Sequence, residues 1–215
     1  MSNPLKTINV SRETLIEARN IYKIHFDEFE NYIDELMWWN KKINLVSRNV
    51  SRETIREHVV HSLVVVPLGV INGPDEWVDA GTGGGIPGIP LAIVTPDVQW
   101  VLNDVVSKKI AAVKQMIHKL NLLNAEGEAE DVKRLEFNKS TGIITKHAFS
   151  ASDLFGMIRE KPWKKLIMYK GVEESKFEFH ELDGSVTGEL FEFDFGEREP
   201  FYEGKGILVI EKNDQ

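Results

Sequence analysis

The segment Trp77–Ile93, "WVDAGTGGGIPGIPLAI", constrains the fold of this chain most strongly. It begins with apolar residues and Asp79, continues with five glycines in eight residues (81, 83, 84, 85 and 88), and ends in an apolar run. A strand, a glycine-rich turn and a helix in this order form the ligand-binding unit of doubly wound α/β folds. We therefore expect an α/β fold with a ligand site at this turn.

Strand and helix patterns alternate after the turn, which predicts a mostly parallel, doubly wound sheet. The last two strands are expected to add an antiparallel edge, which gives a seven-stranded sheet. Strands are predicted at residues 76–80, 98–105, 126–129, 141–149, 164–170, 188–195 and 205–212, and helices at 89–95, 107–122 and 151–160.

The N-terminal third has helical patterns only. Apolar residues recur at helical spacing from residue 12 to about residue 40, which predicts one long helix. A second helix is predicted from Ser51, as N-cap, to Pro67. We therefore expect two parts: an N-terminal helical extension at residues 1–67 and an α/β domain at residues 68–215.

Composition excludes several classes of protein. The chain has 215 residues and no cysteine, so disulfides, thiolate nucleophiles and cysteine-ligated metals are excluded. No apolar run approaches the roughly 20 residues that span a bilayer, and the first 30 residues lack the apolar core of a secretion signal. We expect a cytoplasmic protein.

The formal net charge of −8 is unevenly distributed. Residues 171–215 carry 13 acidic and 4 basic groups, so residues 1–170 are close to neutral. The stretch from Trp38 to Ser62 has five basic residues, Lys41, Lys42, Arg48, Arg52 and Arg56, against two glutamates. Such a stretch is able to contact RNA phosphates, or it forms an ordinary solvated helix face; composition alone leaves both interpretations open.

Three ligands compete for the glycine turn. A P-loop requires Gly-Lys-Ser/Thr, whereas Ile86 and Pro87 follow the glycines here. Residues 83–88 fit the dinucleotide pattern G-x-G-x-x-G, with Asp104 where a ribose-binding acid is expected. Asp79 favours the third ligand, S-adenosylmethionine (AdoMet), because a carboxylate there repels a diphosphate and suits a cationic sulfonium and ammonium.

The chain resembles the glucose-inhibited division protein B family of small-subunit ribosomal RNA guanine-N7 methyltransferases. The resemblance rests on "DAGTGGGIPGIPLAI", "WWNKKINLVS", "EHVVHSL" and "LNDVVSKKIAAVKQM", and it extends from about residue 30 to residue 212. It implies a class I AdoMet-dependent methyltransferase fold with N-terminal helices. It also implies methyl transfer from AdoMet to N7 of a guanine near the decoding centre of 16S rRNA, with 16S rRNA or the 30S subunit as partner.

The resemblance also implies roles for individual residues. The cofactor turn matches Gly81, Gly83, Gly85 and Ile86, the ribose acid matches Asp104, and the pair beside the adenine matches Ala129 and Glu130. The functional lysine of the family matches Lys170, our tentative catalytic residue, and the helix end that faces RNA matches Asn40, Lys41 and Asn44. We add Asp79 as a cofactor contact, and Arg48 and Lys146 as RNA contacts.

Two positions depart from the family pattern. His147 replaces an arginine that follows a strand, and we retain it as a cofactor-binding candidate. His61 replaces an aspartate. If the family's arginine and aspartate contact each other, the two histidines are a compensating exchange; this is a hypothesis. His58 and His61 share a helix face but lack a third ligand at supporting spacing, so no metal site is expected.

Three other functions stay open at this point. They are an AdoMet-dependent methyltransferase with another substrate, an NAD(P)-dependent oxidoreductase, and a non-catalytic AdoMet-binding protein of ribosome assembly. No obligate protein partner and no membrane association are implied.

Overall fold

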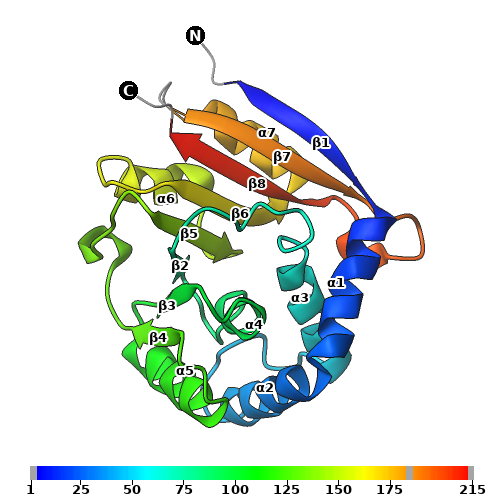
Figure 1. Cartoon of the computed structure of the whole chain (residues 1–215), viewed down its shortest axis with the longest axis vertical. Helices are drawn as coiled ribbons and strands as arrows, with labels where there is room; N and C mark the ends of the chain where they lie inside the picture. Colours follow the sequence, from blue (N-terminus) through cyan, green and yellow to red (C-terminus); the bar gives the residue numbers. More distant parts are fainter. Residues whose placement is uncertain (1–3, 183–185, 213–215) are drawn as a thin grey trace.

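The computed structural model describes residues 4–182 and 186–212, whose strands form one sheet (Figure 1). The strand order is β1-β7-β8-β6-β5-β2-β3-β4. All neighbours pair in parallel except β8, which is antiparallel to both β6 and β7. The strands are β1 (Leu5–Ser11), β2 (Glu76–Ala80), β3 (Gln99–Asn103), β4 (Ala125–Glu128), β5 (Thr141–Lys146), β6 (Lys165–Gly171), β7 (Val186–Asp194) and β8 (Lys205–Lys212).

Seven α-helices are seen in the described residues, with two short 3-10 turns. The helices are α1 (Arg12–Ile24), α2 (Phe26–Asn40), α3 (Arg52–Leu63), α4 (Gly88–Val94), α5 (Ser107–Lys119), α6 (Ala151–Ile158) and α7 (Val172–His180). The 3-10 turns are η1 (Val132–Arg134) and η2 (Pro200–Tyr202). None of the described helices is long and apolar enough to cross a membrane.

The predicted α/β architecture is confirmed, with one strand more than expected. All seven predicted strands are present. The antiparallel pairs are those of the C-terminal strand β8 with β6 and with β7, so the last two strands are antiparallel to each other, as expected. The eighth strand is β1, which pairs in parallel with β7 at the sheet edge (Figure 1). The N-terminal segment therefore begins as part of the sheet and continues as helices; the division at residue 67 stays a prediction.

The prediction of one helix from residue 12 to residue 40 is wrong. The chain turns at His25, where φ is −106° and ψ is 32°, and α1 and α2 follow different directions (Figure 1). Ile24 and Phe26 beside the turn are 76% and 49% exposed, so the buried stripe is interrupted there. Both helices pack on α3, but α1 also packs on β1, whereas α2 also packs on α4 and α5. The two helices therefore share only part of their surroundings.

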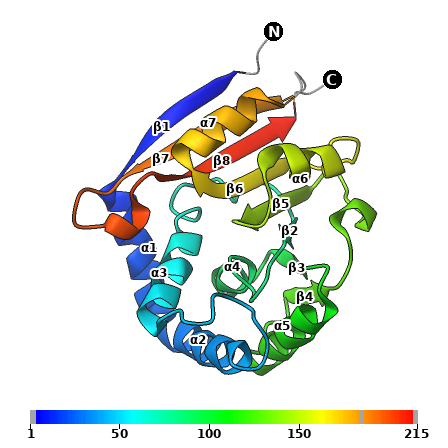
Figure 2. The ribbon, with the colours of Figure 1, turned by 180° about the vertical axis from the view of Figure 1, so that it is seen from behind.

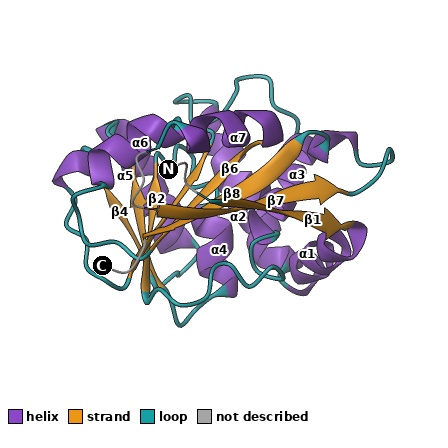
Figure 3. Cartoon of the chain, turned by 90° about the horizontal axis from the view of Figure 1, so that it is seen from above, coloured by secondary structure: helices purple, strands orange, loops and turns teal. Residues whose placement is uncertain are grey.

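Helices cover both faces of the sheet, as the doubly wound pattern requires. α6 and α7 lie together on one face, whereas α4 and α1 lie on the other (Figures 2 and 3). Residues of α2, α3 and α5 belong to the same apolar cluster as those of α1 and α4. Each side has its own cluster of buried apolar residues. The helical N-terminal segment therefore belongs to one of the two cores rather than standing apart from the sheet.

The second N-terminal helix follows its sequence signal closely. The Ser51 side chain accepts a hydrogen bond from the Thr54 amide at 3.0 Å, which confirms it as the N-cap of α3. The helix ends at Leu63, four residues before Pro67, and turns lead from there toward β2.

Candidate functional site

The turn between β2 and α4 has a backbone that requires glycine. Gly81, Gly83 and Gly85 have φ values of 74°, 57° and 92°, a region that side chains with a Cβ rarely adopt. Helix α2 closes over the outside of the turn: the Tyr32 hydroxyl donates to the Gly84 carbonyl at 2.8 Å. The glycine cluster therefore follows from backbone geometry and close packing, and the N-terminal helices help to shape the site.

Asp79 lies beneath the turn and is fully buried. Its Oδ2 accepts hydrogen bonds from the Thr82 hydroxyl at 2.6 Å and the Gly88 amide at 2.8 Å. Burial raises the pKa of Asp79 to about 7, although these two hydrogen bonds oppose the shift. The carboxylate thus holds the turn against the start of α4 and does not line the cavity described next.

A cavity of about 550 Å³ opens at the carboxyl ends of β2, β3 and β5; we call it the main cavity. This is the edge of a parallel sheet where ligands bind. Six of the predicted site residues line it: Gly81, Gly83, Ile86, Asp104, Lys146 and His147. Asp79, Gly85, Ala129 and Glu130 are not among its lining residues.

Asp104 is 6% exposed and stands at the end of β3, as its position in the sequence predicted. Its Oδ2 accepts from the Gly83 amide at 3.3 Å and from Lys109 Nζ at 3.1 Å, and its Oδ1 accepts from the Val106 amide at 2.9 Å. A carboxylate has about four lone-pair sites, so one on Oδ1 remains for a further donor. Asp104 therefore joins the turn to the start of α5 and retains capacity for a ligand hydroxyl.

Ala129 and Glu130 directly follow β4, and Ala129 is exposed. The Glu130 carbonyl accepts a hydrogen bond from Asn103 Nδ2 at 2.8 Å, and Asn103 itself lines the cavity together with Val132. The segment after β4 thus borders the cavity through Val132, and its Glu130 carbonyl holds the side chain of Asn103 in β3.

Lys146, expected on an RNA-facing surface, is 8% exposed and points inward. Its Nζ donates to the His58 carbonyl at 2.8 Å and to Ser62 Oγ at 3.2 Å, so β5 is tied to α3. Burial lowers the pKa of Lys146 well below its usual range. The side chain forms part of the cavity wall, because α3 covers the end of β5.

His147 follows β5 in a left-handed conformation, with φ of 59°, and its side chain reaches the cavity. His58 of α3 lines the same cavity, and burial lowers the pKa of His58 to about 3. The lining of the main cavity therefore includes two histidines, His58 and His147, and the aromatic residue Phe149.

Lys170, the tentative catalytic residue, is 6% exposed at the end of β6 and lies outside the main cavity. Its Nζ is 2.9 Å from Glu174 Oε1, 3.1 Å from Glu178 Oε2 and 3.2 Å from the Phe149 carbonyl. Three acceptors match the three N–H donors of an ammonium group. The structure therefore gives Lys170 the contacts of a residue that positions its neighbours.

The predicted RNA-binding residues at the end of α2 divide into two groups. Asn40 Oδ1 accepts from the amides of Leu45 and Val46 at 2.9 and 3.0 Å, so Asn40 holds the loop that lines the cavity. Lys41, Asn44 and Arg48 are exposed, and Arg48 Nε donates to Asn44 Oδ1 at 3.0 Å. This second group is exposed, whereas Asn40 is half-buried.

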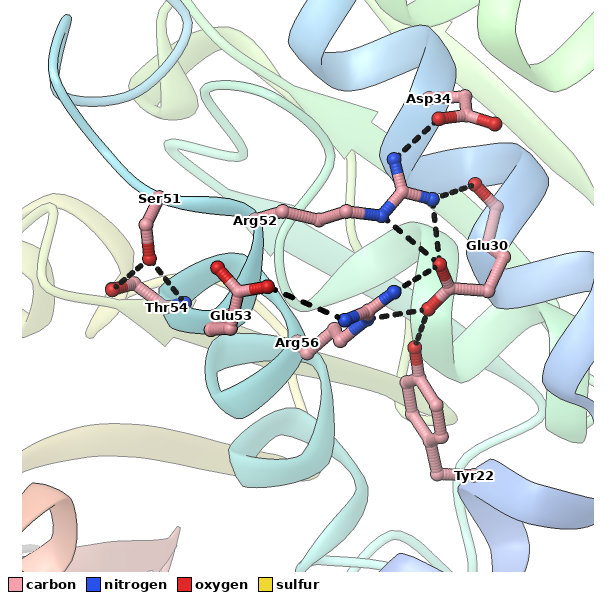
Figure 4. A network of polar contacts seen from close by, with 8 residues as sticks. All are labelled: Tyr22, Glu30, Asp34, Ser51, Arg52, Glu53, Thr54 and Arg56. Carbon is pink, nitrogen blue, oxygen red and sulfur yellow. Dashed lines mark hydrogen bonds and ion pairs between the residues drawn. The ribbon is translucent and has the colours of Figure 1, made fainter.

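Two of the five cations of the basic stretch, Arg52 and Arg56, form ion pairs within the protein (Figure 4). Arg52 and Arg56 of α3 both contact the Glu30 carboxylate of α2, with Arg56 Nε 2.8 Å from Glu30 Oε1. Arg52 also pairs with Asp34, and the Tyr22 hydroxyl donates to Glu30. The Arg56 and Arg52 contacts hold the pKa of Glu30 at about 2, so the carboxylate is ionised at neutral pH. The two arginines therefore belong to a network that joins α1, α2 and α3. They are not part of a plain solvated helix face.

Lys41, Lys42 and Arg48 form no ion pair within the described residues. Lys42 Nζ lies 3.2 Å from the ring centroid of Trp38, which is 47% exposed. Cations and an exposed indole therefore remain together on the surface beside the loop that Asn40 holds.

No group of three or more histidine, aspartate or glutamate residues in the described ranges is arranged to hold a metal ion.

Sequence reasoning missed several residues of the main cavity. Thr82 and Asn103 stand next to predicted residues and were within reach of the same motif argument. Ile55 and His58 belong to α3, whose position over the end of β5 is a tertiary feature without a local sequence signal.

Comparisons with known proteins agree with this geometry. The family model described as rRNA small subunit methyltransferase G matches residues 25–192. A ribosomal RNA small subunit methyltransferase G of Chlorobium phaeobacteroides is 33% identical over 191 residues, which cover 87% of this chain and 84% of that protein. A protein of the same name from Haemophilus influenzae is 33% identical over 180 residues, covering 81% and 86% of the two chains.

Solved structures resemble the chain in fold. An O-methyltransferase from Bacillus cereus in complex with SAH has a TM-score of 0.56 at 14% identity, covering 84% of this chain and 90% of that one. The 23S rRNA methyltransferase ErmE has a TM-score of 0.52 at 11% identity, covering 77% and 70%. The fold is that of the class I methyltransferases, and the chain belongs to the rRNA small subunit methyltransferase G family.

Proposed function

We propose that this protein transfers a methyl group from AdoMet to N7 of a guanine in 16S rRNA. Membership of the family supports small-subunit rRNA as the substrate class. The observation that carries the proposal is the main cavity, where the glycine turn and Asp104 meet at the carboxyl edge of the sheet. The choice of N7 and of a base near the decoding centre rests on the family resemblance.

The residues of the main cavity fit AdoMet. Gly81 and Gly83 line the cavity with their backbone, and the free lone pair of Asp104 Oδ1 suits a ribose hydroxyl. Ile86 and Val132 provide apolar walls for the adenine. We propose Gly81, Gly83, Ile86 and Asp104 as cofactor contacts. Asp79 and Gly85 act indirectly, by holding the turn in shape.

AdoMet supplies an electrophilic methyl group on a sulfonium when it is bound. Guanine N7 carries an available lone pair, so the protein has no proton to remove before transfer. The protein therefore needs to align the base with the donor and to exclude water. His58, His147 and Phe149 line the cavity, and their rings are suited to that task.

We propose the surface at the end of α2 as an RNA contact. Lys41, Lys42 and Arg48 provide positive charge without an ion-pair partner in the part of the chain that the structure describes, and the exposed ring of Trp38 suits stacking with an unpaired base. Asn40 supports this surface because its side chain holds the loop that follows α2.

Calorimetry with S-adenosylhomocysteine and with NADH separates the cofactor classes. The proposal predicts saturable binding of S-adenosylhomocysteine and none of NADH. Labelled AdoMet with 16S rRNA or 30S subunits from a strain that lacks the modification then tests transfer. Binding without transfer to either substrate would favour a non-catalytic protein of ribosome assembly.

A further inference from the structure

A second cavity of about 310 Å³ adjoins the main cavity, and the proposed function does not yet use it. It is lined by the segment from His147 to Ser150 and by Tyr169, Lys170 and Glu174. His147, Ala148 and Phe149 line both cavities, so the two share one wall. A group held in the second cavity therefore lies next to the main cavity, across this shared wall.

The polar side of the second cavity is fixed by three charged residues. Lys170 contacts Glu174, Glu178 and the Phe149 carbonyl, which saturates its ammonium group. Glu178 Oε2 also accepts from the Ala151 amide, so α7 is joined to the segment that separates the cavities. The contact with Lys170 holds Glu174 in place through its Oε1.

Glu174 is the accessible acceptor of this cavity. Its side chain is 55% exposed, and Lys170 contacts its Oε1. The hydrogen bond from Lys170 holds the pKa of Glu174 below its usual range, so the side chain is a carboxylate at neutral pH and accepts hydrogen bonds only. A ligand group that contacts Glu174 therefore presents hydrogen-bond donors, N–H or O–H.

Guanine is the base that matches a carboxylate. Its Watson–Crick edge carries two adjacent donors, N1–H and the N2 amino group, whereas adenine and cytosine present ring-nitrogen acceptors there. N7 lies on the opposite side of the purine from this edge. A guanine whose Watson–Crick edge faces Glu174 therefore presents N7 toward the main cavity. Enzymes that modify bases commonly take the target out of the stack and read its Watson–Crick edge.

We propose that the second cavity is the acceptor subsite for the target guanine and that Glu174 reads its N1–H and N2 amino donors. This inference rests on the proposed function and adds to it a residue that determines base specificity. Lys170 and Glu178 are positioning residues for Glu174, which gives Lys170 a role that needs no proton transfer.

The test compares guanosine with inosine, which lacks only the N2 amino group. After the methylated base is mapped with labelled AdoMet, rRNA fragments are ligated with guanosine or inosine at that position. For the wild-type protein, kcat/KM is expected to fall about 10- to 100-fold with inosine, since a hydrogen bond to a charged group is lost. Glu174→Gln should methylate both RNAs slowly and nearly equally, with unchanged affinity for S-adenosylhomocysteine.

Glu173→Gln is the matched control, because Glu173 is exposed in the same turn of α7 and pairs only with Lys176 within the described residues. It should discriminate as the wild type does. Discrimination retained by Glu174→Gln, or absent from the wild-type protein, would overturn the inference while leaving the proposed function standing. A wild-type protein that methylates no rRNA would instead overturn the proposed function.

Discussion

The imidazole rings of His61 and His147 lie side by side, with their centroids 6.4 Å apart. His61 is 1% exposed, and neither of its ring nitrogens has a hydrogen-bond partner among the described residues. Burial lowers the pKa of His61 well below its usual range, so the ring is neutral. The two positions that depart from the family pattern are thus neighbours, as the hypothesis of a compensating exchange requires.

We expect the two substitutions to be coupled. Alone, His61→Asp places a carboxylate among aromatic rings and should destabilise the fold by about 3 kcal/mol. With His147→Arg added, a guanidinium beside the carboxylate should restore more than about 1 kcal/mol. Urea unfolding of the wild type, both single variants and the double variant measures the coupling. Additive effects, within about 0.5 kcal/mol, would reject the exchange hypothesis.

Glu30→Gln should weaken the joint between the N-terminal helices. The substitution leaves Arg52 and Arg56 without their shared carboxylate, and we expect a loss of about 2 kcal/mol at pH 7. Because the folded pKa of Glu30 is about 2, below the ordinary value, its stabilisation is present above about pH 4.5 and disappears as the pH falls toward 2. The variant should therefore lose less stability than the wild type between pH 5 and pH 3.

Glu53→Gln is the control for that experiment. Glu53 is exposed and lies 3.6 Å from Arg56, so its replacement should change the free energy of unfolding by less than about 0.5 kcal/mol. Equal effects of the two substitutions would show that the network in Figure 4 does not hold the helices together.

Gly81→Ala should abolish binding of S-adenosylhomocysteine. A Cβ at this position would lie 2.4 Å from the Cβ of Ala148, and the φ of 74° is unfavourable for alanine. The segment that separates the two cavities would have to move. Gly156→Ala, in helix α6 with no atom within 4 Å of an added Cβ, should bind normally and gain up to about 1 kcal/mol of stability. Calorimetry and thermal unfolding measure both; normal binding by the Gly81 variant would contradict the role given to the turn.

Asp79 should make stability fall as the pH rises. The folded pKa of about 7 lies above the ordinary value of 3.8, so the folded protein keeps a proton that the unfolded chain releases. Stabilisation from this group is complete below about pH 4 and is lost as the pH approaches 7. Asp79→Asn stays neutral throughout, so its unfolding free energy should decrease less between pH 5 and pH 8 than that of the wild type. Asp97→Asn, at an exposed site, should match the wild type at both pH values.

Local signals in the sequence predicted the centre of the fold and of the candidate site. The glycine turn and Asp104 were predictable because main-chain geometry and strand ends produce recognisable sequence patterns within a few residues. Strand β1 was missed because it lies at the sheet edge and buries only Val10, so it has no clear alternation. The turn at His25 was missed because apolar residues continue across it at nearly helical spacing.

Side-chain pairing between elements explains the remaining differences between the sequence predictions and the structure. The arginines of α3 look like a surface patch in the sequence, and only the approach of α2 shows that Glu30 neutralises them. The burial of Lys146 likewise depends on a neighbouring element, because α3 lies over the end of β5. The carboxylate of Asp79 was expected to face the ligand, but it bonds to the turn and to α4 instead.

The most direct test of the account is the position of the transferred methyl group. Labelled AdoMet and the protein are incubated with 16S rRNA and with 30S subunits from a strain that lacks N7 modification, and the rRNA is then treated with borohydride and aniline, which cleave at 7-methylguanine. We expect incorporation of label and scission at a single guanine. Label at another atom, without scission, or no transfer to either substrate, would contradict it.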